Sequence, residues 1–248
     1  MPSRSDSTEL DKRDLLMKAL NIPDYSSQLN QDLASAEREG NRLDEKYKDK
    51  LDRLRDAIKT RCKEKEAASD LLFIDCDAAD HRIPGLACWK MISTCPWSEE
   101  DCIIYHFCSR HTLSNDPMRG LQDLVKSLIW QLLKKTDIKI KSSIFRELQK
   151  DAGVSNLRIL RRLLKEYFKQ KGDWILACVI DGAECFDTRE WRGEMEAVFK
   201  LLCEICPEEI FKVFVTCPRE NVVIHGDKSL TSFMFWDENL KRYVVEST

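Results

Sequence analysis

An apolar run at residues 174–180 (WILACVI) ends in Asp181, and Glu184 follows three residues later. A buried strand of this kind brings its terminal carboxylate to the carboxyl edge of a parallel sheet, where nucleotides bind in open α/β folds. There the carboxylate can hold Mg²⁺ through water, and the second acid can orient an attacking water. The pattern has the form of a Walker B strand. Many α/β domains also end a strand in aspartate for structural reasons alone, so the pattern by itself does not decide the function.

Cysteine and histidine residues suggest a zinc site as an alternative. Cys203 and Cys206 have the spacing of a zinc knuckle, but they fall in an apolar helical pattern, where residues three apart share the core face. Further ligands would have to come from Cys95, Cys102, His106 and Cys108, and alternation along a strand points some of these apart. The pattern favours cysteines used as small apolar residues over a metal site.

Three other groupings carry little chemical information. Cys76 and His81 are close enough in sequence for a Cys–His catalytic pair, but nothing marks a specific nucleophile. The three aspartates of residues 75–80 could form a cation loop, yet the glycine and the distal glutamate of an EF-hand are missing. His106 lies between two aromatic residues in an apolar run, which is typical of a core histidine.

The elements that must position these residues follow from hydrophobic periodicity. Apolar runs bounded by polar residues predict buried parallel strands at residues 71–74, 102–108, 174–180 and 211–216. Apolar residues at helical spacing predict helices at residues 118–133, 142–148, 157–168 and 195–205. Strands that alternate with helices indicate a layered α/β domain. The low counts of glycine (8) and proline (7) argue against a turn-rich all-β fold.

The N-terminal part has a different texture. Residues 36–66 are nearly all charged or good helix formers, with one narrow apolar stripe. The stripe consists of Leu43, Tyr47, Leu51, Leu54 and Ile58. We expect this helix to dock on its own domain; a coiled-coil contact with a partner is the alternative, although the stripe is shorter than three heptads. The chain is thus divided into a helical region at 1–66 and an α/β domain at 67–248.

Composition excludes several classes of protein. The 40 basic and 43 acidic residues give a net charge of -3, which disfavours a nucleic-acid binder. The longest apolar run is far shorter than the roughly 20 residues that span a bilayer. The polar start, MPSRSDSTELDKRD, has no apolar signal core. We therefore expect a cytoplasmic protein that binds neither nucleic acid nor membrane, with its 11 cysteines reduced.

The order of the predicted elements resembles the NACHT NTPase domain of fungal STAND proteins, which are NLR-like signalling ATPases, and especially the nephrocystin-3-like N-terminal type. Four stretches carry the resemblance: CIIYHFCSR at 102–110, MRGLQDLVKSLIWQLL at 118–133, VIDGAEC at 179–185 and FKVFVTCPREN at 211–221. The lead-in at 15–33 and the tail at 233–247 are also similar. The resemblance implies a three-layer P-loop NTPase sheet flanked by helices, and homologous STAND proteins or a second copy as partners.

The chain departs from this family at the phosphate loop. It has no G-x-x-x-x-G-K-[ST], whose backbone N–H groups and lysine hold the phosphates. The corresponding segment reads DCDAADHRIP at 75–84, which places Arg82 at the lysine position. Its three acids would face a polyanion, and like charges at 4–6 Å repel by about 1–4 kcal/mol each. In the sensor strand, the family's Arg-Pro becomes Pro218-Arg219.

These departures favour a non-catalytic regulatory or scaffold protein derived from a STAND NTPase. It would act through protein partners, which would bind the charged helix or an exposed sheet edge, without a cofactor. The alternative is a divergent ATP- or GTP-binding switch or NTPase. In that case Asp181 and Glu184 would act on Mg²⁺ and water, and Arg82 or Arg219 would contact phosphate.

Overall fold

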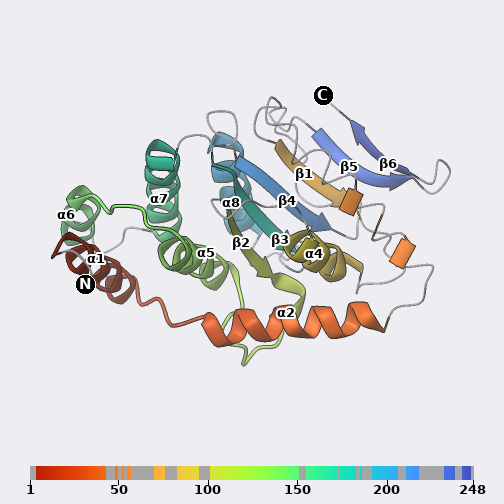
Figure 1. The fold of residues 1–248 in the computed structure, drawn as a ribbon, viewed down its shortest axis with the longest axis horizontal. Helices are drawn as coiled ribbons and strands as arrows, with labels where there is room; N and C mark the ends of the chain where they lie inside the picture. Colours follow the sequence, from red (N-terminus) through yellow and green to blue (C-terminus); the bar gives the residue numbers. More distant parts are fainter. Residues whose placement is uncertain are drawn as a thin grey trace.

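The computed structural model describes most of the chain, namely residues 4–42, 48–49, 52, 55–56, 70–75, 83–94, 101–150, 155–171, 174–182, 185, 192–205, 211–217, 232–237 and 242–246. One sheet lies at the centre, with helix α4 (Ile83–Thr94) on one face and helix α8 (Arg192–Ile205) on the other (Figure 1). The α/β fold predicted from the sequence is therefore confirmed.

The sheet has six strands in the order β2-β3-β4-β1-β5-β6. The four predicted strands are confirmed as β1 (Asp70–Asp75), β2 (Cys102–Phe107), β3 (Leu176–Asp181) and β4 (Phe211–Cys217). They run parallel, as does β5 (Ser232–Asp237) beside β1, whereas β6 (Arg242–Glu246) is antiparallel to β5. Strands β5 and β6 lie outside the four runs predicted as strands. Strand β3 lies between β2 and β4 and is buried along its whole length, which explains its continuous apolar run.

Four helices follow the predicted pattern between the strands. They are α5 (Leu121–Lys135), α6 (Ser142–Lys150), α7 (Asn156–Lys171) and α8. Helix α7 packs against α5 and α8, and α5 also packs against β2. Helix α4 was not predicted, because its first turn contains Pro84 and Gly85, which are common in turns. Proline is nonetheless compatible with a first helical turn, where its missing N–H has no partner to lose.

The N-terminal region forms α1 (Arg4–Ala19) and α2 (Ser26–Asn41). Helix α2 begins ten residues before the expected charged helix, and the five apolar stripe residues lie outside the described parts of the chain. Helix α2 docks on α4 through a face that buries Leu29, Ala36 and Gly40. A Cβ at Gly40 would lie 2.7 Å from the Trp89 ring, so only glycine permits this close approach. The boundary at residue 66 and the coiled coil stay predictions.

Strand β2 is an edge strand whose free backbone groups are covered by α5. The Gln131 side chain accepts a hydrogen bond from the Tyr105 N–H (3.1 Å) and donates one to the Tyr105 carbonyl (2.6 Å). Lys135 Nζ donates to the Ile103 carbonyl at 2.8 Å. These bonds occupy the groups with which another strand would pair. The β2 edge is therefore closed to strand addition along these residues.

Replacing Gln131 with leucine should destabilise the protein. Leucine is similar in size to glutamine, but it cannot form hydrogen bonds. The buried Tyr105 N–H and carbonyl would both lose their partner, which should lower the free energy of unfolding by about 1–3 kcal/mol each. Chemical denaturation followed by circular dichroism measures the loss. A Gln122→Leu variant, which alters an exposed residue of the same helix, should change the free energy of unfolding far less. Equal effects of the two substitutions would contradict the role given to Gln131.

Candidate functional site

Asp181 lies at the carboxyl edge of the sheet, where the sequence placed it. It ends β3, and its side chain is completely buried. Three other segments meet it there: the short 3-10 helix η1 (Cys108–Arg110) after β2, the end of β4, and the first turn of α4. These segments are adjacent because the carboxyl ends of parallel strands share one edge.

Both carboxylate oxygens of Asp181 accept hydrogen bonds from within the protein. The Ser109 hydroxyl donates to Oδ2, and the Thr216 hydroxyl donates to Oδ1 at 3.1 Å. Thr216 in turn accepts the Gly182 N–H at 3.1 Å. Helix α4 packs directly over the carboxyl group, since a Cβ at Gly85 would lie 3.5 Å from Oδ2. The carboxyl group is therefore enclosed as well as hydrogen-bonded.

Gly182 is the residue that allows η1 to approach this strand end. Its φ of 63° lies in the left-handed region, a backbone conformation that residues with a side chain rarely adopt. A Cβ there would also lie 3.0 Å from the Ser109 backbone nitrogen. The glycine in the sequence IDGAE thus has a structural reason, which is the close contact between the ends of β2 and β3.

The environment of Asp181 is unfavourable for a metal-binding carboxylate. Burial raises the pKa of Asp181, and the hydrogen bonds from Ser109 and Thr216 offset this only in part. Magnesium prefers ionised, accessible carboxylates and keeps several of its waters. A completely buried carboxyl group with both oxygens already bonded does not provide that. The described residues of this edge therefore do not fit a Mg²⁺ site.

The other proposed nucleotide ligands are not placed by the structure. Arg82, Glu184 and Arg219 lie outside the described residues, as does the loop at 76–82. Of the four site residues predicted from the sequence, Asp181 is the one whose neighbours the structure describes. The roles of the other three stay predictions.

The cysteines that the structure describes behave as core residues. They form no disulfide: Cys88, Cys102, Cys108, Cys178 and Cys185 are all thiols. Burial raises the pKa of Cys102 to about 11 and that of Cys178 to about 12, so both are protonated at neutral pH. Within the described ranges, no group of three or more potential metal ligands gathers at one point. Cys76, His81, Cys95 and Cys206 lie outside those ranges, so the wider zinc hypothesis is not tested.

His106 is a core histidine, as the sequence indicated. It is buried, and its Nδ1 lies 2.8 Å from the Ser127 hydroxyl. Burial, and after it the charge of the nearby His111, lowers the pKa of His106 to about 3. A neutral, enclosed imidazole of this kind contributes to packing and is a poor general base at neutral pH.

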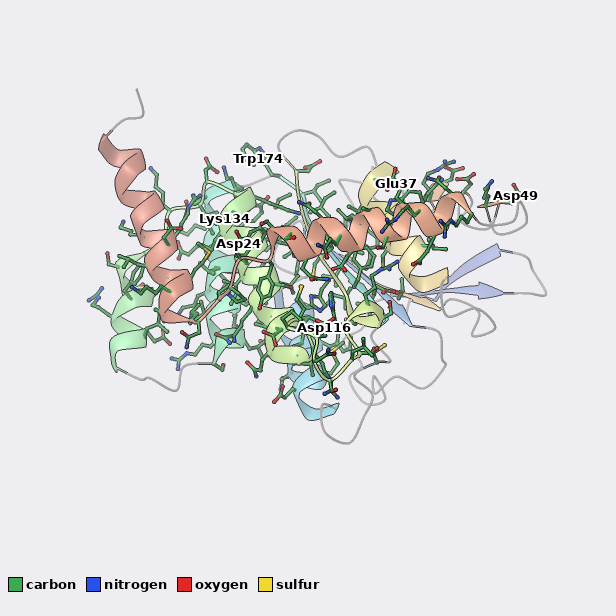
Figure 2. The ribbon with its side chains drawn as sticks, turned by 90° about the horizontal axis from the view of Figure 1, so that it is seen from below. Asp24, Glu37, Asp49, Asp116, Lys134 and Trp174 are labelled. Atoms are coloured by element: carbon green, nitrogen blue, oxygen red, sulfur yellow. The ribbon has the colours of Figure 1, made fainter. Side chains whose placement is uncertain are left out.

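A second cluster, which no local sequence pattern indicates, joins the segment after η1 to α2. His111 Nε2 lies 3.0 Å from Asp32 of α2, and its Nδ1 lies 3.1 Å from both oxygens of Asp116. Because carboxylates only accept hydrogen bonds, both ring nitrogens must donate, which requires the imidazolium form. Burial lowers the pKa of His111, but the two carboxylates outweigh it, so the pKa is raised overall. Asp116, on the segment between η1 and α5, is labelled in Figure 2.

A further ion pair lies beside this cluster. The Arg110 guanidinium donates to both carboxylate oxygens of Glu39 on α2, at 3.2 and 2.9 Å. Three consecutive residues, Ser109, Arg110 and His111, thus connect the Asp181 edge of the sheet to α2. No local pattern marks these contacts, because Asp32 and His111 are 79 residues apart.

Comparison with known proteins identifies one related family. A family model described as Nephrocystin 3, N-terminal matches residues 87–217, slightly more than half of the chain. The match begins within α4 and ends with β4, and so includes Asp181 and η1. No match was found among curated proteins or among solved structures.

Replacing Asp181 with asparagine tests its buried state. The wild-type carboxyl has a raised pKa in the folded protein, so folding favours the protonated form. Stability should therefore fall as pH rises above the unfolded pKa of about 3.9 and level off above the folded pKa. Asparagine cannot ionise, so this decline should disappear. Urea unfolding at a series of pH values measures this decline in the free energy of unfolding. If the decline persists in Asp181→Asn, another ionisable group causes it.

Replacing His111 with glutamine should leave the buried Asp32 carboxylate without its charged partner. We expect a loss of about 3 kcal/mol in the free energy of unfolding at pH 6. Because the folded pKa of His111 is raised, its contribution is complete below about pH 6.5 and is lost as pH rises through the folded pKa. The difference between wild type and His111→Gln should shrink accordingly. Asp32→Asn in the His111→Gln background should restore part of the stability, whereas a pH-independent difference would contradict this account.

Proposed function

Because the chain belongs to the nephrocystin 3 N-terminal family, we propose that it is a regulatory or scaffold protein that acts through protein–protein contacts without catalysis. The proposal includes descent from a STAND-type NTPase and a P-loop-type fold. The observation that carries it is the state of Asp181. The carboxyl group that would hold Mg²⁺ in a working relative is enclosed and bonded to Ser109 and Thr216.

The strand order supports a P-loop-type architecture. Strand β1 lies between β4 and β5, and the helix that follows it, α4, begins beside Asp181. The segment after β1 therefore leads to the same edge as the acid that ends β3. This is the arrangement in which a phosphate loop and a Walker B aspartate act together.

The sequence of that segment argues against nucleotide binding. No glycine-rich loop with its lysine and hydroxyl residue occurs anywhere in the chain. The first turn of α4 offers Pro84, which has no N–H, and Gly85, which packs on the Asp181 carboxyl. Family membership and the lost motif together favour a domain that keeps the fold of an NTPase without its reaction.

Partner contacts are proposed for the charged helical region at 36–66, with homologous STAND proteins or a second copy of this chain as partners. The alternative surface, a sheet edge, is less favourable at β2, because Gln131 and Lys135 occupy its backbone groups. Within the described part of that region, Glu37 and Arg38 are exposed on α2, away from the face that packs on α4. A cytoplasmic location is part of this proposal. The described chain holds no helix with the length and apolar character needed to cross a bilayer.

A divergent ATP- or GTP-dependent switch is the second candidate. The position of Asp181 beside the start of α4 favours it, because helix N-termini at this edge bind phosphates in related architectures. It requires Glu184, Arg82 or Arg219 to reach the same edge.

Thermal unfolding with and without Mg-ATP or Mg-GTP separates the two candidates. A nucleotide present at 100 times its Kd would add about 2.7 kcal/mol to the free energy of unfolding. We expect no change in Tm at millimolar nucleotide, and no release of inorganic phosphate. An increase in Tm that Asp181→Asn abolishes would establish the switch and overturn the scaffold proposal.

A further inference from the structure

Positive charge is concentrated in one stretch of the chain. Residues 134–171, from the end of α5 to the end of α7, contain twelve Lys and Arg against four Asp and Glu. This stretch has a net charge of +8, although the whole chain is at -3. This uneven distribution of charge creates a positive potential around the stretch, although the net charge of the whole chain is slightly negative.

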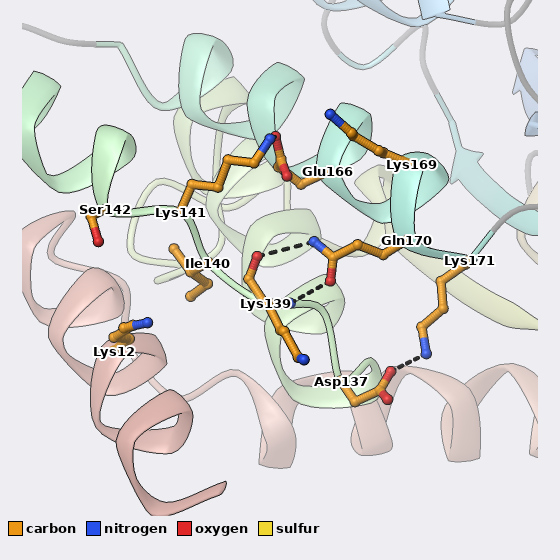
Figure 3. Close-up of a pocket in the computed structure, with 10 residues that line it drawn as sticks. All are labelled: Lys12, Asp137, Lys139, Ile140, Lys141, Ser142, Glu166, Lys169, Gln170 and Lys171. Atoms are coloured by element: carbon orange, nitrogen blue, oxygen red, sulfur yellow. Dashed lines mark hydrogen bonds and ion pairs between the residues drawn. The ribbon is translucent and has the colours of Figure 1, made fainter. Parts of the chain in front are cut away.

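Part of this charge lines a pocket beside α1. The pocket has a volume of about 640 Å³ and is formed by α1, the segment that joins α5 to α6, the start of α6 and the end of α7 (Figure 3). Five lysines and two acids line it. The lysines are Lys12, Lys139, Lys141, Lys169 and Lys171.

Two of these lysines pair with the two acids of the lining. Lys141 pairs with Glu166 at 2.5 Å, and Lys171 pairs with Asp137. Neither Lys139 nor Lys169 has an ion-pair partner among the residues that the structure places. Their ammonium groups therefore add positive charge to the pocket that its own carboxylates do not balance.

The backbone holds Lys139 in place at this pocket. The Lys139 N–H donates to Gln170 Oε1 at 2.7 Å, and the Lys139 carbonyl accepts from Gln170 Nε2 at 3.1 Å. Gln170 is the neighbour of Lys169 on α7, so one side chain joins the two elements that carry the uncompensated lysines. This contact is visible in Figure 3. Gln170 thus holds the backbone of Lys139 against the turn of α7 that carries Lys169.

The start of α6 adds to the positive character of the pocket. Ser142 begins this helix of nine residues and lines the pocket. The first N–H groups of a helix have no partner within it, and they carry its positive dipole end. The Ile144 N–H already donates to the Lys141 carbonyl at 3.0 Å. Together with the lysines of the lining, the N–H groups before it are donors suited to phosphate oxygens.

From this arrangement we propose that the pocket binds a compact anion with several phosphate groups, of the inositol polyphosphate type. The volume suits a small molecule. The described lining has no aromatic ring on which a base could stack, which disfavours a nucleic acid as the ligand. The phosphates can belong to a free molecule or to a lipid headgroup. This inference does not depend on the proposed function, because the pocket is separate from Asp181.

Isothermal titration calorimetry with inositol hexakisphosphate and with inorganic tripolyphosphate tests the proposal. We expect binding that weakens with added salt. The double variant Lys139→Gln/Lys169→Gln should weaken binding by about tenfold or more, because two charge-assisted contacts are lost. The control Lys18→Gln/Lys200→Gln removes the same charge from exposed positions outside the pocket, and it should bind as wild type does. Matching Tm values would show that all three proteins are folded.

Two further measurements complete the test. Sedimentation with vesicles that contain phosphatidylinositol 4,5-bisphosphate shows whether a membrane-bound headgroup is also accepted; binding to the vesicles, lost in Lys139→Gln/Lys169→Gln, identifies a lipid source, and its absence identifies a free one. The proposal is overturned if neither polyphosphate binds, if both double variants bind equally well, or if a DNA duplex or an acidic peptide binds the lysines in place of the polyphosphates.

Discussion

The architecture of this domain depends on a carboxyl group removed from water at the edge of its sheet. A buried acid is costly unless it is hydrogen-bonded, and Asp181 meets that requirement with hydroxyl groups from two neighbouring segments. The contacts of Gly182 and Gly85 follow from it, because each lets the backbone come close to the same strand end. An arrangement that could have held a ligand is instead held together by its own side chains.

The same edge is joined to the N-terminal helices by ionic contacts. Ser109 of η1 bonds to Asp181 of β3, whereas Arg110 of η1 and His111, the next residue, bond to α2. A displacement of α2 would therefore pull on the segment that contacts the end of β3. The family match covers η1 and the sheet but not α2. The buried pair of Asp32 and His111 therefore connects the part of the chain that the family model matches to a helix outside that match.

The sequence was most informative where one local pattern decided the structure. Strand β3 has a continuous apolar run, and Asp181 follows it directly, so both were predictable. Helix α2 was misjudged because its buried face includes Asp32 and Gly40, which break the hydrophobic periodicity. The surroundings of Asp181 and His111 could not be predicted, since they depend on residues brought together by the sheet order. The lysine pocket likewise combines three separate elements.

The closed edge at β2 has a consequence for assembly. Sheets can grow into open-ended filaments when one exposed edge of a molecule adds to the opposite edge of the next. Here Gln131 already occupies the Tyr105 backbone at one end of the sheet. Head-to-tail stacking through that end would first require the loss of these bonds. Along these residues of β2, extension of the sheet by a strand of another molecule is therefore disfavoured, which removes one of the two partners that filament growth of this kind needs.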